Sequence, residues 1–224
     1  MAGHSLGEYS ALAASGALSR PDAVRLTRQR GEWMKRAGEK SPGGMAAVLN
    51  LDDDVLESVC RQAVNETGGV VQIANYNSPG QIVISGDQVT LNRACELATE
   101  QGARRVVMLA VSVSSHSPLM AYASDGLRNA ISQVEVLPPG VPVIGNVSAE
   151  PLSSVGEVEH EMVAQLTSPV RWTASVQEMS NRGVERFVEV GPGNVLTGLV
   201  RRTEKKAEVV NINDGASLQA FMEG

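Results

Sequence analysis

At 224 residues the chain is long enough to bury a sizeable core, as one domain or as one domain with an insertion. Hydrophobic residues make up 42% of a composition typical of soluble globular proteins, and aromatic residues only 3%, so Ala, Val, Leu, Ile and Met must fill the core. The formal net charge of −6 argues against binding to nucleic acid, which needs a basic surface.

Cysteine and histidine usage narrows the chemistry further. Cys60 and Cys95 lie far apart and form no C-x-x-C pair, so we expect reduced thiols in a cytoplasmic protein. The histidines at positions 4, 116 and 160 are too scattered to predict a metal site. No run of residues approaches the length of a membrane span, so a membrane is not an expected partner either.

The first ten residues contain Gly3-His4-Ser5-Leu6-Gly7, which fits the G-x-S-x-G pattern of a nucleophile elbow, a sharp turn from strand into helix. We expect the two glycines to keep side chains out of this turn, so that Ser5 stands exposed above a helix N-terminus. A hydroxyl there can attack an acyl carbon, and the backbone N–H of Leu6 can point at the oxyanion that forms. The alternative is a simple helix-capping serine between glycines, because so short a pattern often occurs by chance.

Two helices are predicted next, over about 6–17 and 19–38. The second begins at Ser19-Arg20-Pro21-Asp22, a capping box with proline in the first turn. Its apolar stripe at three- and four-residue spacing includes Arg30, which therefore faces inward. An inward guanidinium needs an anion, since an unpaired buried charge is very costly. A structural ion pair or a side chain that reaches water from the edge of the stripe explains the pattern as well.

A regular pattern begins after the boundary at Ser41-Pro42-Gly43-Gly44. Its elements alternate as strand, helix, strand, strand, helix and strand, over 45–51, 52–64, 70–75, 81–85, 88–101 and 105–110. The central pair of strands flanks Asn77-Ser78-Pro79-Gly80, a strong turn signal. This βαββαβ order is typical of a ferredoxin-like unit, which could fold as an inserted subdomain.

The remainder returns to larger α/β elements. His116 lies in a serine-rich turn after the last strand of the inserted unit, well placed to face a cleft. Helices are predicted over 118–134 and 158–165 and after Pro169, with strands over 141–147 and 186–190. The sequence thus predicts an α/β protein with a large subdomain over 1–43 and 111–224 and an inserted subdomain over 44–110.

Seven stretches, taken in order, resemble the malonyl-CoA:acyl-carrier-protein transacylases of fatty acid synthesis. The resemblance covers nearly the whole chain and is carried by GHSLGEYSAL (3–12), QRG (29–31) with Met34, GMAA (44–47), NYNSPGQ (75–81), SHSPLM (115–120), QL (165–166) with PVRW (169–172), and EVGPG (189–193). It implies an α/β-hydrolase-like large subdomain with a parallel sheet and a ferredoxin-like small subdomain inserted into it.

The resemblance also implies roles for matching residues. Ser5 would be the acylated nucleophile, and His116 its general base and later the acid for the leaving thiol. No triad carboxylate is expected, because the backbone carbonyl of Gln165 would orient the imidazole. Arg30 would pair with the free carboxylate of the malonyl group, and the backbone N–H of Leu6 would bind the oxyanion.

Three asparagines are expected near the substrate. Asn146 matches a cleft asparagine near the histidine, whereas Asn75 and Asn77 either line the cleft or serve the tight turn between their strands. His4 is expected to pack beneath the elbow, and His160 is given no role.

The implied activity is malonyl transfer from malonyl-CoA, through an acyl-serine, to the phosphopantetheine thiol of acyl carrier protein. The thioester is already activated, so no metal or redox cofactor is expected. An α/β-hydrolase-like serine esterase or thioesterase shares the elbow, but it needs an acid between nucleophile and histidine and a histidine late in the chain. An inactive fragment that only binds carrier protein is a second alternative.

The resemblance adds one expectation about the start of the chain. In the family, a strand and a Gly-Gln-Gly loop precede the elbow, and the loop supplies a second oxyanion N–H. Gly3 stands two residues after Met1 here. We therefore expect a fragment that is a poor catalyst by itself.

Overall fold

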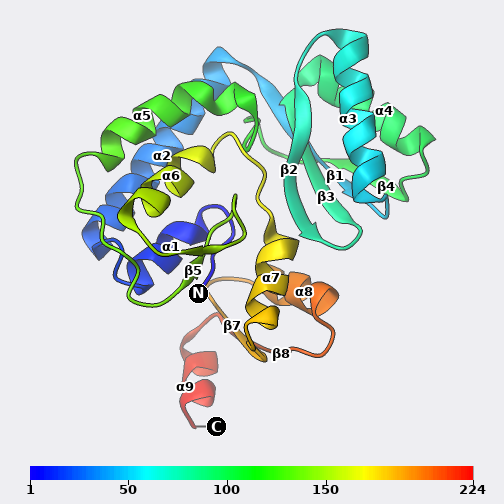
Figure 1. Cartoon of the computed structure of the whole chain (residues 1–224). Helices are drawn as coiled ribbons and strands as arrows, with labels where there is room; N and C mark the ends of the chain where they lie inside the picture. Colours follow the sequence, from blue (N-terminus) through cyan, green and yellow to red (C-terminus); the bar gives the residue numbers. More distant parts are fainter. Residues whose placement is uncertain (224) are drawn as a thin grey trace.

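The computed structural model describes residues 1–223. Helices α1 (Gly7–Ala14), α2 (Arg20–Lys40), α5 (Ala121–Ile131) and α6 (Val155–Ala164) pack together on one side of the molecule (Figure 1). Helix α2 begins where the capping box predicts, since the side chain of Ser19 accepts from the N–H of Asp22. The buried faces of these helices form the largest hydrophobic core, which includes Leu12, Leu26, Leu127, Met162 and Leu166.

A four-stranded sheet forms the second part of the fold. Its strands are β1 (Gly43–Leu49), β2 (Val71–Ser78), β3 (Gln81–Asp87) and β4 (Arg105–Met108), in the antiparallel order β2-β3-β1-β4. Helices α3 (Asp53–Thr67) and α4 (Gln88–Glu100) cover one face and share a separate core with it (Figure 1). Strands and helices follow one another in the predicted βαββαβ order. The two helices could be predicted because each carries an apolar face of helical period.

The edge of this sheet is joined to the rest of the chain. Asn75 in β2 forms a parallel bridge with Val170, where the N–H of Tyr76 donates to the carbonyl of Val170 at 2.9 Å. The N–H of Val170 returns a bond to the carbonyl of Ala74 at 2.8 Å, and Thr173 Oγ1 donates to the carbonyl of Tyr76. These bonds hold β2 against the segment that enters α7 (Trp172–Asn181).

Strand 141–147 is shorter than predicted, since only β5 (Val143–Ile144) pairs, antiparallel with β6 (Pro151–Leu152). Ile144 also forms a parallel bridge with Ala2, next to the elbow. The N–H of Gly145 still donates to the carbonyl of Glu150, but the N–H of Asn146 donates to the side chain of Glu8, so regular strand pairing does not continue. Within residues 1–223 the parallel pairing is limited to isolated bridges and one two-stranded sheet of β7 (Arg186–Val190) and β8 (Glu208–Ile212).

The last elements have no counterpart among the predictions. Helix α8 (Val195–Thr203) connects β7 to β8 and packs on both, and α9 (Gly215–Glu223) follows at the C-terminal end (Figure 1). No helix in the described part of the chain is long and apolar enough to cross a membrane.

Candidate active site

Ser5 stands in a tight turn between the bridge at Ala2 and the start of α1. Its φ of +50° lies in the left-handed region, which a non-glycine residue seldom adopts. The N–H of Gly7 donates to the carbonyl of His4 at 2.9 Å, and the N–H of Glu8 donates to that of Ser5 at 3.1 Å. Ser5 is therefore held at the N-terminus of α1, as the elbow pattern predicts.

The two glycines of the elbow are not equivalent. A Cβ on Gly3 would lie 2.0 Å from the carbonyl oxygen of Gly7, whereas a Cβ on Gly7 would meet nothing within 4 Å. The expectation that both glycines relieve crowding is therefore correct for Gly3 and wrong for Gly7. Glycine is needed at position 3 because the backbone of Gly7 and Glu8 lies too close to leave room for a side chain.

We expect the Gly3→Ala variant to be less stable than the parent by about 1–3 kcal/mol, because the added methyl group must push the turn apart. Gly7→Ala is the matched control and should be neutral or slightly stabilising, since alanine has the higher helix propensity. Denaturant unfolding of both variants measures the difference. Equal losses at the two positions would contradict the crowding argument.

His116 lies directly beside the serine, although 111 residues separate them. Its Nε2 is 2.8 Å from Ser5 Oγ, and its Nδ1 is 2.7 Å from the backbone carbonyl oxygen of Gln165. A carbonyl oxygen can only accept, so Nδ1 carries the hydrogen and Nε2 accepts the hydroxyl proton of Ser5. The carbonyl dipole occupies the place that a carboxylate takes in a Ser-His-Asp triad.

The charge state of His116 suits a base. Burial lowers its pKa to about 4, and the positive charge of Arg30 and the ring of His4 act in the same direction, while the Gln165 carbonyl opposes them. The imidazole is therefore neutral at pH 7 and free to take a proton.

Arg30 completes the group of side chains around the hydroxyl. It is 6% exposed, and its Nη2 donates to Ser5 Oγ at 2.9 Å and to Gln165 Oε1 at 3.0 Å. Burial lowers the pKa of the guanidinium, while Tyr9, whose ring lies 6.0 Å away, and Glu8 raise it. Its Nε is buried and has no partner among residues 1–223. The guanidinium is thus not fully paired within the described residues, and its Nη2 lies directly beside Ser5 Oγ.

Two of the three asparagines, Asn146 and Asn77, contact residues of the elbow. Asn146 is fully buried, and its Oδ1 accepts from the N–H of Ser5 at 2.7 Å. Asn77 Oδ1 accepts from His4 Nε2 at 2.8 Å, and the His4 ring packs against Trp172. Asn75 is buried in β2 at its bridge to the C-terminal part of the chain.

The two remaining positions considered in the sequence analysis are Leu6 and His160. Leu6 directly follows Ser5 at the N-cap of α1, and its side chain is half exposed. His160 is exposed on α6 and lines a separate cavity of about 270 Å³ with Asp125 and Arg128.

Sequence reasoning missed Glu8 and the side chain of Gln165. Glu8 is fully buried, and its carboxylate accepts from Asn146 and Gln165. Burial and the neighbouring charge of Glu161 raise the pKa of Glu8, whereas the N–H donors of Asn146 and Gln165 and the positive charge of Arg30 lower it. The available signal was a lone acidic residue among small and apolar ones, one turn after the predicted nucleophile.

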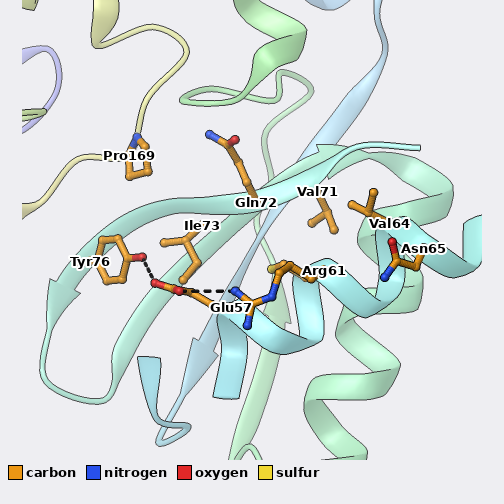
Figure 2. A pocket seen from close by; sticks show the side chains of 10 residues that line it. Glu57, Arg61, Val64, Asn65, Val71, Gln72, Ile73, Tyr76 and Pro169 are labelled. Atoms are coloured by element: carbon orange, nitrogen blue, oxygen red, sulfur yellow. Dashed lines mark hydrogen bonds and ion pairs between the residues drawn. The ribbon is translucent and has the colours of Figure 1, made fainter. Parts of the chain in front are cut away.

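A cavity of about 410 Å³ lies elsewhere, between α3, β2 and Pro169 (Figure 2). Glu57 accepts from the Tyr76 hydroxyl at its rim. Gln72, which lines this cavity, donates to the backbone carbonyls of His116 and Thr167 at 2.8 and 3.1 Å. Within residues 1–223 no group of three or more His, Cys, Asp or Glu side chains is arranged to hold a metal ion.

Comparisons with known proteins agree with one another over nearly the whole chain. A family model described as acyl transferase domain matches residues 1–218. The malonyl CoA-acyl carrier protein transacylase of Bacillus subtilis is 43% identical over 218 residues, which are 97% of this chain and 68% of that relative.

Solved structures show the same similarity. An acyl carrier protein S-malonyltransferase from Vibrio cholerae has a TM-score of 0.95 at 43% identity, covering 98% of this chain and 71% of the other. A malonyl-transacylase in complex with a type II PKS acyl-carrier protein has a TM-score of 0.95 at 39% identity, covering 100% of this chain and 72% of the other.

Proposed function

This chain belongs to the acyl transferase domain family, and from that premise we propose that it transfers a malonyl group from malonyl-CoA to acyl carrier protein through an acyl-enzyme on Ser5. The observation that carries the proposal is the contact of Ser5 Oγ with both His116 Nε2 and Arg30 Nη2. A nucleophile, its base and a carboxylate-binding group thereby meet at one atom.

In the first half-reaction, Arg30 binds the free carboxylate of malonyl-CoA. His116 Nε2 takes the proton of Ser5 Oγ as that oxygen attacks the thioester carbonyl carbon, and the backbone N–H of Leu6 stabilises the oxyanion. The Gln165 carbonyl stabilises the imidazolium through its Nδ1–H. The carbon–sulfur bond then breaks, and the imidazolium returns its proton to the departing thiolate of coenzyme A.

The second half-reaction reverses these roles. The phosphopantetheine thiol of the carrier protein loses its proton to His116 and attacks the acyl carbon. The bond to Ser5 Oγ breaks, and the oxygen recovers the proton from the imidazolium. Over the two half-reactions one thioester is consumed and another is formed, so the residues of the site need no metal or redox cofactor for the transfer.

A serine esterase or thioesterase is less well supported. The buried guanidinium beside Ser5 Oγ favours substrates with a free carboxylate, and a backbone carbonyl stands where such hydrolases place an acid. A protein that only binds carrier protein would not need a neutral, buried histidine against a serine.

The finer division of the fold is part of the same proposal. We assign residues 1–43 and 111–224 to an α/β-hydrolase-like subdomain and residues 44–110 to a ferredoxin-like one. The strand order β2-β3-β1-β4 and the separate core under α3 and α4 support this division. The free thiols of Cys60 and Cys95 support a cytoplasmic location.

Intact-protein mass spectrometry tests the function directly. After exposure to malonyl-CoA, the protein should carry one malonyl adduct, which peptide mapping places on Ser5 and which holo-acyl carrier protein removes. Ser5→Ala is the control and should remain unmodified. An adduct on another residue, or its loss to water faster than to the carrier thiol, would overturn the proposal.

A further inference from the structure

Glu8 lies one turn after Ser5, on the inner side of α1, and is completely buried. Its Oε1 accepts from the backbone N–H and from the Nδ2 of Asn146, both at 2.8 Å. Its Oε2 accepts from Gln165 Nε2 at 2.5 Å. All of these partners are N–H donors, so they match a carboxylate that accepts on both oxygens.

The bonds to Asn146 determine where that amide points. Asn146 Nδ2 donates to Glu8 Oε1 and also to the carbonyl of Gly3, each at 2.8 Å. With both N–H groups occupied, Oδ1 must face the opposite way, and there it accepts from the N–H of Ser5 at 2.7 Å. Glu8 thereby holds the nucleophile in its left-handed conformation through one intervening side chain.

The bond to Gln165 has a similar effect on the other side of the hydroxyl. Gln165 Nε2 donates to Glu8 Oε2 and to the carbonyl of Ser5, the latter at 3.1 Å. Its Oε1 is left to accept from Arg30 Nη2 at 3.0 Å. The backbone carbonyl of the same residue receives the Nδ1–H of His116. One carboxylate therefore orients the residue that holds both the base and the anion-binding group.

Burying a charged carboxylate at this position costs free energy. Burial disfavours its charged form, and so does Glu161 on α6, while Arg30 on α2 and the donors from Asn146 and Gln165 favour it. A carboxamide would fit the same volume. It would, however, present an N–H to the Nε2 of Gln165, and turning the Gln165 amide to relieve that conflict would direct Nε2 at the guanidinium of Arg30.

We propose that Glu8 is a positioning residue for acyl transfer, whose acceptor-only carboxylate sets the amide orientations of Asn146 and Gln165 and through them the places of Ser5, His116 and Arg30. This inference rests on the proposed function. It assigns Glu8 no contact with substrate.

Two substitutions separate hydrogen-bond polarity from shape. Glu8→Gln keeps the volume but introduces a donor, and we expect malonylation of Ser5 to slow by about 10²-fold, the order typical of a small misplacement of reacting groups. Glu8→Asp keeps two acceptors on a shorter stem and should retain more activity than Glu8→Gln. A role in packing alone predicts the reverse order, because glutamine is the closer match in size.

Glu161→Gln is the matched control. Glu161 is also buried, and its carboxylate accepts from the N–H of Val147, but within residues 1–223 this side chain makes no hydrogen bond to Ser5, His116, Gln165 or Arg30. Removing its charge should leave the malonylation rate close to that of the parent. Circular dichroism and thermal melting should show all three variants folded.

A second measurement does not depend on turnover. The Nδ1–H of His116 should give a low-field proton resonance in protein labelled with ¹⁵N-histidine, and this resonance should move in Glu8→Gln and stay in place in Glu161→Gln. The variant Gln165→Met tests the same network without changing Glu8. It keeps the backbone carbonyl but breaks the link to Arg30, so the preference for malonyl over acetyl transfer should fall.

The outcomes distinguish the two proposals. If the parent protein is not malonylated on Ser5, the proposed function fails. If the parent is malonylated and Glu8→Gln is equally fast, or faster than Glu8→Asp, the positioning role of Glu8 is overturned while the function stands. An unmoved His116 resonance in a folded Glu8→Gln protein overturns it as well.

Discussion

Replacing His116 with alanine should slow the malonylation of Ser5 by about 10²–10⁴-fold, the range typical of losing a general base. The substitution removes the acceptor that lies 2.8 Å from Ser5 Oγ. Arg30, the other side chain beside this oxygen, is already protonated and cannot act as a base. Stopped-flow or quenched-flow measurement of the acyl-enzyme gives the rate. His160→Ala is the matched control, because His160 is exposed on α6 and should leave the rate unchanged.

The pH dependence of the same rate tests the state of His116. For an imidazole with the ordinary pKa of about 6.5, the neutral fraction would fall roughly 25-fold between pH 7 and pH 5. Burial lowers the pKa of His116 to about 4, so its neutral form should persist over this interval and be lost only as the pH falls through 4. A rate that drops tenfold or more between pH 7 and pH 5 in folded protein would contradict this assignment.

Arg30→Ala should lower the rate of malonyl transfer by about one to two decades and leave acetyl transfer nearly unchanged or improved. A charge-assisted, two-pronged pair with a carboxylate contributes roughly 1.5–3 kcal/mol, and acetyl-CoA has no carboxylate to form it. Arg30→Lys should recover little, because an ammonium group cannot reproduce the planar fork. Competition between the two thioesters for one enzyme preparation measures the ratio directly.

Arg28→Ala is the control for that experiment. Arg28 lies on the same helix but is exposed and paired with Glu32, so its loss should leave the malonyl to acetyl ratio unaltered. Equal losses of malonyl and acetyl transfer in Arg30→Ala would mean that Arg30 acts through the placement of Ser5 and Gln165 and does not select the carboxylate.

Local patterns in the sequence predicted much of the candidate site. The elbow pattern predicted a turn at Ser5, and the helical stripe predicted that Arg30 faces inward, because both depend on residues only a few positions apart. The helix N-cap at Ser19 and the regular strands and helices between residues 43 and 108 also follow from short-range preferences. The order of motifs then indicated that His116 and Gln165 belong with Ser5, and the structure places their atoms within hydrogen-bond distance.

Only the tertiary structure decided how these groups are held. Glu8 meets Asn146 across 138 residues of sequence and Gln165 across 157, and contacts of such separation leave no periodic pattern to read. The same holds for the early end of β5, beyond which the N–H of Asn146 donates to the side chain of Glu8, and for Gly3, which is crowded where Gly7 is not. The low pKa of His116 and the raised pKa of Glu8 arise from burial, which is a property of the packed chain as a whole. The sequence predicted which groups lie at the candidate site, and the fold decided their orientation and charge, because both depend on neighbours that only long-range packing supplies.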